Sequence, residues 1–221
     1  MNLRRLLFAA SFLLTQHGVS AQTRADTLLG DFTGDWRSEW NDQELADRVN
    51  DFTTSIDGES LRVRSEGSAS AIWRSIDYSG QDGVRLRWRW KIDRVIPENA
   101  RERERAGDDY SARFFVVFDG TPFQSRAKAI CYVWASSELV GAAFLNPHVD
   151  NVATVVLQSG DDLSGEWITE ERDVTGDYES LFGRAPRSVT GVAIMVDTDN
   201  TANTAVAWFD DVIVLLDKTQ F

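Results

Sequence analysis

The sequence predicts an all-β fold, a two-sheet β-sandwich of jelly-roll type (galactose-binding-like or concanavalin-like) with one short helix. Segments rich in Val, Ile, Phe, Trp and Thr recur along the chain, as expected of strands. Turn residues such as Ser79-Gly80 and Asp199-Asn200 separate these segments. Because the pattern shows no internal repeat or change of composition, we expect residues 22–221 to form a single domain.

The clearest local element is a hairpin at Asp57-Gly58, a strong turn signal between strands expected at 51–56 and 59–65. A short helix is expected at Asp177–Phe182, ended by Gly183. The remaining strands are expected, in order, at 69–76, 83–92, 111–119, 127–135, 152–159, 165–172, 188–197 and 205–216.

Residues 94–108 interrupt this pattern, because apolar residues nearly vanish after Ile96 while Arg and Glu alternate from Arg101 to Arg105. Such composition is typical of a solvated, mobile loop. The alternative is a lid over a neighbouring site, with a short helix supported by Glu–Arg pairs three residues apart.

The N-terminus reads as a secretory signal peptide over residues 1–21. Arg4 and Arg5 precede a short apolar run, and Val19-Ser20-Ala21 fits a cleavage site. No other stretch is long and apolar enough to span a bilayer, so we expect a periplasmic or secreted protein without stable membrane insertion. The formal net charge of −12 disfavours nucleic acid as a partner.

Cysteine and histidine usage limits the possible chemistry. Cys131 is the single cysteine and lies in an apolar run, which predicts a buried thiol and excludes a disulfide within the chain. His148 is the only histidine after residue 21, so a structural zinc site lacks ligands. A catalytic role for His148 as a general base has only this isolated residue to support it.

The segment "RLRWRWKI", residues 85–92, places cations on one face of a strand and Trp88 and Trp90 on the other. If this strand neighbours 111–119, Arg87 or Arg89 can pair with Asp109. Arg113 shares a face with Phe115 and therefore needs a partner. Either internal acids neutralise these cations, or some of them meet an anionic or hydroxyl-rich ligand.

Tyr132 and Trp134 share one face of the strand expected at 127–135. Aromatic rings on a sandwich can stack on sugar rings, and the alternative is packing in the core. The predicted ligand-binding face is Arg87, Arg89, Asp109, Arg113, Tyr132 and Trp134.

Acidic residues suggest a metal in two places. Asp197 and Asp199 alternate within a loop, as carboxylates do in calcium loops, and Asp210-Asp211 lies within the last strand, where one carboxylate must be buried. The alternative for both is turn chemistry and surface charge. We therefore expect, at most, a structural calcium ion as cofactor.

Ordered motifs across the chain resemble a bacterial family of exported proteins, the domain of unknown function 3047. They include "LRWRWKI", "DDYSARFFVVFDG", "CYVWA", "NPH", "WITEERDVTGDYESLFGRAP" and "GVAIMVDTDNTANTAVAWFDDVIV". The resemblance implies a compact exported domain and no established activity.

A looser resemblance is to jelly-roll carbohydrate-binding modules, through the opening "LLGDFTGDW" and the closing "WFDDVIVLL". It implies that the terminal strands lie together and that Asp31 with Asp210 or Asp211 holds a structural calcium ion. Thr33 departs from the acidic residue common at its position, so one side-chain ligand is missing.

These patterns predict an exported, non-catalytic, glycan-binding protein of the cell envelope, with a polysaccharide or oligosaccharide as partner. The first alternative is a polysaccharide lyase or glycoside hydrolase on the same scaffold, which needs a cleft with shifted titratable groups. The second alternative is an envelope protein-interaction domain, which needs an exposed apolar patch.

Overall fold

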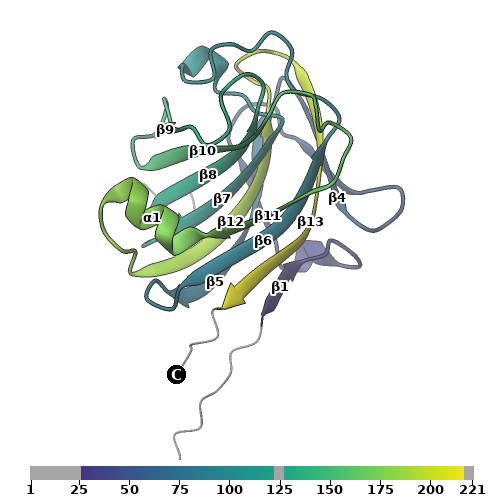
Figure 1. Cartoon of the computed structure of the whole chain (residues 1–221). Coiled ribbons are helices and arrows are strands. Elements are labelled where there is room, and N and C mark those ends of the chain that lie inside the picture. Colours follow the sequence, from purple (N-terminus) through teal and green to yellow (C-terminus); the bar gives the residue numbers. More distant parts are fainter. Residues whose placement is uncertain (1–25, 122–126, 217–221) are drawn as a thin grey trace, which may run out of the picture.

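A computed structural model of the chain describes residues 26–121 and 127–216. Two sheets face each other as a β-sandwich, which confirms the predicted fold class (Figure 1). The signal peptide expected at 1–21 lies outside the described residues. Within them, no helix is long and apolar enough to cross a membrane.

The six-stranded sheet, here sheet A, has the order β11-β6-β13-β4-β3, with β1 also paired to β13. Its strands are β1 (Thr27–Gly30), β3 (Asp51–Thr54), β4 (Leu61–Glu66), β6 (Val84–Ile92), β11 (Ile168–Asp173) and β13 (Thr204–Leu216).

The seven-stranded sheet, here sheet B, has the order β2-β5-β12-β7-β8-β10-β9. Its strands are β2 (Asn41–Glu44), β5 (Ala69–Ser79), β7 (Ala112–Phe118), β8 (Lys128–Ala135), β9 (Ala143–Leu145), β10 (Val152–Ser159) and β12 (Ser188–Asp197). All its neighbouring strands run antiparallel except β8 and β10, which are parallel.

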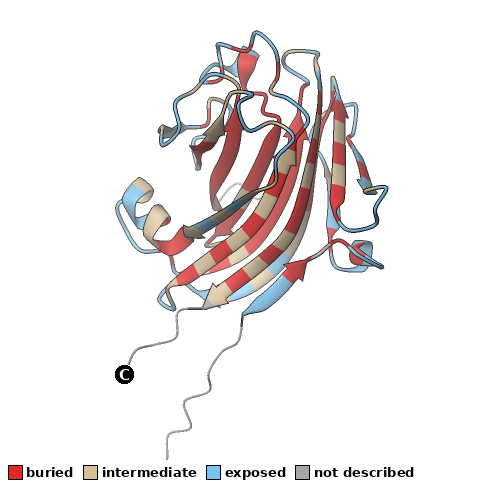
Figure 2. Ribbon diagram, turned by 45° about the vertical axis from the view of Figure 1, so that its right-hand side comes forward, coloured by how far each residue is buried: buried red, intermediate tan, exposed pale blue. Residues whose placement is uncertain are grey.

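Strict alternation of side chains builds the core between the sheets. Along β6, buried residues alternate with partly exposed ones, so Trp88 and Trp90 point inward while the arginines point outward (Figure 2). The Trp88 ring stacks on Phe114 of sheet B, with 4.2 Å between ring centroids. This contact joins the two sheets through large apolar surfaces.

The strands expected from composition are all present, and the hairpin around Asp57-Gly58 joins β3 to β4. Three strands that were not expected, β1, β2 and β9, are short, and each pairs with a single neighbouring strand. The helix α1 (Val174–Phe182) begins earlier than expected, because the Asp173 side chain caps it by accepting from the Gly176 N–H. It ends as predicted at Gly183, which has φ of 72°.

The expected pairing of strand 85–92 with strand 111–119 is wrong. β6 lies between β11 and β13 in sheet A, whereas β7 lies between β12 and β8 in sheet B. The charged segment 94–108 crosses from one sheet to the other, so successive strands in the sequence are not neighbours in space.

This crossing segment is mostly exposed but is fixed to the sandwich at several points, and its mobility stays a prediction. Glu102 is fully buried, and its carboxylate accepts the backbone N–H groups of Ser136, Ser137 and Glu138 at 2.6–2.9 Å. Arg103 pairs with the Glu138 carboxylate at 2.7 Å. The segment ends in the 3₁₀ turn η2 (Arg105–Gly107), one of two in the described chain; the other is η1 (Trp36–Ser38).

Candidate functional site

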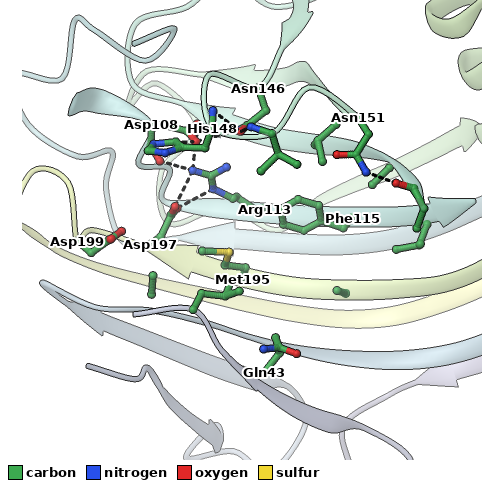
Figure 3. Close-up of a pocket in the computed structure, with 18 of the residues that line it drawn as sticks. Gln43, Asp108, Arg113, Phe115, Asn146, His148, Asn151, Met195, Asp197 and Asp199 are labelled. Carbon is green, nitrogen blue, oxygen red and sulfur yellow. Dashed lines mark hydrogen bonds and ion pairs between the residues drawn. The ribbon is translucent and has the colours of Figure 1, made fainter. Parts of the chain in front are cut away.

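The outer face of sheet B holds a groove of about 590 Å³. Its floor comes from alternate residues of neighbouring strands, with Phe115 of β7 opposite Ala193 of β12 and Met195 in the same row as Arg113 (Figure 3). Alanines occupy several floor positions, and their small side chains leave the space open. These alanines are Ala69, Ala127, Ala129 and Ala193.

Two segments form the walls of the groove. The connection between β9 and β10 supplies Asn146, His148 and Asn151, and on the other side Gln43 projects from β2 (Figure 3). Asn146 is held in place because its side-chain oxygen accepts the backbone N–H groups of His148 and Val149 at 2.9 and 3.0 Å. The wall is therefore built from polar groups on an ordered turn.

One end of the groove is a buried charge cluster around Arg113, whose exposed fraction is 2%. Its guanidinium binds the Asp197 carboxylate through two hydrogen bonds, of 2.7 and 2.6 Å, and lies 3.2 Å from an Asp108 oxygen. Its flat face lies over the Tyr110 ring, 4.5 Å from the centroid. Every charged partner of Arg113 is thus internal, which is the first of the two alternatives that the sequence left open.

Carboxylates outnumber the cation at this end. Asp109 accepts from the Asn200 side chain at 3.0 Å and from the Thr201 N–H at 2.6 Å. Oxygens of Asp109, Asp197 and Asp199 lie within 4.8 Å of one another. Burial, and secondarily the charge of Asp109, raises the pKa of Asp199.

Calcium at this cluster stays a prediction. Both Asp109 oxygens accept N–H groups and both Asp197 oxygens bind Arg113, so only Asp199 presents a carboxylate that is mainly exposed. A calcium ion takes about 6–8 oxygen ligands. The carboxylate oxygens of Asp109 and Asp197 therefore already accept hydrogen bonds from nitrogen atoms, and they are not arranged to coordinate an ion.

Stability should fall with rising pH because of Asp197. Burial raises its pKa to about 8, with Asp109 and Asp108 adding to the rise and Arg113 opposing it. A carboxyl group whose pKa is higher in the folded state stabilises the fold fully below the pKa of the unfolded chain. This contribution is lost as the pH rises through the folded-state pKa of about 8. Between about pH 5 and pH 8 we expect the free energy of unfolding to fall, by at most about 1.4 kcal/mol per pH unit.

Urea unfolding of the wild type and of Asp197→Asn across this range would measure the effect. The Asn variant cannot titrate, so its pH slope should be shallower. Asp77→Asn, at an exposed position of β5, should keep the wild-type slope. Equal slopes in all three proteins would contradict the role of Asp197.

The predicted ligand residues are not brought together. Arg87 and Arg89 point outward from sheet A, on the opposite side of the sandwich from Asp109 and Arg113. Arg89 binds the Asp210 carboxylate through Nε, at 3.1 Å, and Nη2, and lies 3.1 Å from Asp211.

Tyr132 and Trp134 lie in the core between the sheets, so the expected aromatic platform on this strand is corrected. The Tyr132 hydroxyl donates to Asp177 at 2.6 Å, and the Trp134 indole N–H donates to the Gly160 carbonyl at 3.1 Å. Both rings are almost completely buried. The run 129–135 is apolar on both faces, so alternation alone could not assign its inward face.

The residues that the looser resemblance assigned to calcium are also held by other partners. β1 and β13 do pair, with Gly30 opposite Val212, as that resemblance implied. However, Asp31 accepts from the Thr33 N–H and hydroxyl at 3.1 and 3.0 Å. Asp210 is buried against Arg89, and Asp211 has φ of 50° at an irregularity of β13.

Sequence reasoning missed most groove residues, including Phe115, Met195, Asn146 and Gln43. One signal was available in the sequence: Ala129 and Ala193 are small residues in strands that otherwise consist mainly of bulky ones. Cys131 is buried as predicted, and burial raises the pKa of its thiol to about 12. This thiol is therefore an unreactive part of the fold.

A comparison with protein families matches residues 38–213 to the family described as protein of unknown function (DUF3047). The chain belongs to this family. The DUF3047 match includes every residue that lines the groove. A comparison with curated proteins finds no significant match.

Solved structures similar to this DUF3047 chain include three proteins of low sequence identity. The family 11 carbohydrate-binding module from Clostridium thermocellum, in complex with a β-1,3-1,4-mixed-linked tetrasaccharide, aligns at 9% identity with a TM-score of 0.43, over 86% of this chain and 95% of its own. A xyloglucanase domain of a type three effector from Sinorhizobium fredii, in complex with cellobiose, aligns at 12% identity with a TM-score of 0.49, over 80% and 93%. A cellulose-induced protein aligns at 12% identity with a TM-score of 0.47, over 87% and 97%.

Proposed function

We propose that this protein is an exported, non-catalytic binding protein for a neutral, hydroxyl-rich glycan held in the groove of sheet B. The observation that carries the proposal is the groove itself, which combines an apolar floor with a hydrogen-bonding wall and a carboxylate-rich end. Saccharides present the same two chemistries, because C–H faces alternate with hydroxyl groups around each ring.

The floor offers one aromatic ring and several aliphatic side chains to the apolar face of a sugar. Phe115 is partly exposed on this floor, beside Met195 and Val117. The wall and the charged end offer side-chain oxygens and nitrogens from Gln43, Asp199 and Asn200. Carboxylates are strong acceptors for hydroxyl donors.

The charge of the groove selects against acidic sugars. Arg113 is already paired with Asp197 and Asp108, so its charge cannot also neutralise a uronate carboxylate. The surrounding Asp109 and Asp199 add negative charge. A polysaccharide lyase of uronates in this groove is therefore disfavoured, because among the described residues that line it Arg113 is the one arginine or lysine, and its charge is already paired.

Replacing Phe115 with leucine should weaken binding about tenfold, because an apolar side chain remains on the floor while the stacking ring is lost. Asp199→Asn should also weaken it. Phe144→Leu is the matched control, since Phe144 is another partly buried phenylalanine of sheet B that does not line the groove. A glycan array would find the ligand, and isothermal titration calorimetry would measure the affinities.

Two results would contradict the neutral-glycan proposal. The first is the absence of any neutral glycan among the binders. The second is a loss of affinity in Phe144→Leu as large as in Phe115→Leu, which would assign the effect to general damage of the sheet.

The non-catalytic part of the proposal has its own test. His148 is the groove residue best placed to move a proton, and its Nε2 lies 3.2 Å from the Arg105 carbonyl oxygen. Incubation with each bound glycan should release no new reducing ends. If the wild type releases new reducing ends and His148→Ala does not, the protein is instead an enzyme on this scaffold.

A further inference from the structure

The outer face of sheet A carries a row of tryptophans and cations that the groove does not use. Lys91 of β6 stands opposite Trp208 of β13, and Trp208 stands opposite Arg62 of β4. On the other side, Ile168 pairs with Trp90, which places Trp167 next to Lys91. We call Trp167, Lys91, Trp208 and Arg62 the tryptophan–cation row.

Lys91 lies between the two indole rings. Its ammonium nitrogen is 5.0 Å from the Trp167 centroid and 4.6 Å from the Trp208 centroid. Both tryptophans are partly exposed, so their rings form part of the surface rather than of the core. Cation–π contacts at such sites contribute about 0.5–1 kcal/mol each and hold the rings in a fixed arrangement.

The charges on this face are unevenly paired. Arg64, Arg85 and Arg89 bind Glu66, Glu171 and Asp210 respectively. Among residues 26–121 and 127–216, no carboxylate lies within 4.0 Å of the cationic groups of Arg62, Arg87 or Lys91.

Packing and cation–π contacts explain why a lysine stands at position 91 between two indole rings. They do not explain why Arg62 and Arg87 stand on the same face. Each of these arginines is partly buried on the sheet and makes no ion pair within 4.0 Å in the described chain; Glu171 stands opposite Arg87 across the strand pair but binds Arg85. Asp57 and Glu59 influence Lys91 and Arg89 from a distance, so the face is mixed in sign. An anionic group placed between the free cations would therefore gain short-range pairing rather than long-range attraction.

We propose that the tryptophan–cation row, together with Arg87, is a second glycan-binding surface that takes an acidic polysaccharide of the polyuronate class. Pyranose rings lie on Trp167 and Trp208, and their carboxylates meet Arg62, Lys91 and Arg87. This surface is separate from the groove, on the other side of the sandwich, and it does not depend on the function proposed for the groove.

Oligogalacturonate is the probe, and its methyl ester is the neutral counterpart with the same sugar backbone. Calorimetry should show binding of the acid form and at least about tenfold weaker binding of the ester. Arg62→Gln should weaken binding of the acid about tenfold. Arg64→Gln is the matched control, because Arg64 lies on the same strand and face but is already paired with Glu66, and it should change affinity less than about twofold.

A second variant separates ring stacking from charge. Trp208→Ala should abolish oligogalacturonate binding while Phe115→Leu in the groove leaves it unchanged, and near-ultraviolet circular dichroism confirms folding. Three results would overturn the proposal: equal binding of acid and ester, an equal loss in Arg64→Gln, or binding only to vesicles of anionic phospholipid. The last result would identify the row as a membrane-contacting surface.

Discussion

Replacing Arg113 with alanine is expected to lower the free energy of unfolding by about 3–5 kcal/mol. The substitution removes a guanidinium that is 2% exposed and leaves the buried Asp108 carboxylate, together with the carboxyl group of Asp197 whose pKa is raised, without the guanidinium that both contact. Uncompensated buried charge is among the most destabilising changes a fold can undergo. The cluster also anchors the end of the crossing segment 94–108, so the groove should lose its charged end.

Urea unfolding of the wild type and the variant would measure this loss. Arg87→Ala is the control, because Arg87 is also an arginine on a strand but has no ion pair in the described chain, and its effect should stay within about 0.5 kcal/mol. If Arg113→Ala keeps wild-type stability but loses glycan binding, then Arg113 binds the ligand directly, contrary to the geometry.

Replacing Trp88 with alanine is expected to cost a similar amount, about 3–5 kcal/mol. Trp88 is fully buried, stacks on Phe114 at 4.2 Å between centroids and contacts the Tyr132 ring at 5.4 Å. Since Trp88 belongs to sheet A and the other two rings to sheet B, its loss leaves a cavity where the sheets join.

Trp88→Phe tests whether the ring or the indole N–H matters. The Trp88 N–H is buried and has no hydrogen-bond partner in the described chain, so phenylalanine removes an unsatisfied donor while keeping an aromatic ring. We expect a loss below about 1.5 kcal/mol. Chemical unfolding should rank wild type, Trp88→Phe and Trp88→Ala in that order, and equal losses in both variants would contradict the stacking argument.

The fold class was predictable because strand alternation is a local property. In β6 the cations and apolar residues alternate without exception, so the inward position of Trp88 and Trp90 follows from the sequence. In β8 every position from Ala129 to Ala135 is buried, and the same reasoning could not place Tyr132. Edge strands such as β2, with the sequence NDQE, have no apolar pattern and form through pairing with β5.

The candidate site was only partly predictable. Of the predicted ligand residues, Arg113 lines the groove, Asp109 is buried beside its charged end against Asp197 and Asp199, and Arg87, Arg89, Tyr132 and Trp134 do not line it. The groove depends on alanines from several strands lying side by side. Strand order determines such a neighbourhood, and strand order arises from long-range pairing.

The β-rich fold, the turns, the buried thiol of Cys131 and the charged face of β6 could all be predicted from local sequence patterns. Local propensity and periodicity are sufficient for these features, because they depend on residues a few positions apart. The pairing of acids with cations, by contrast, depends on how distant strands assemble and could not be predicted locally. Arg89 pairs with Asp210 and Arg113 with Asp197, partners 121 and 84 residues apart, because strands from distant parts of the chain meet in each sheet.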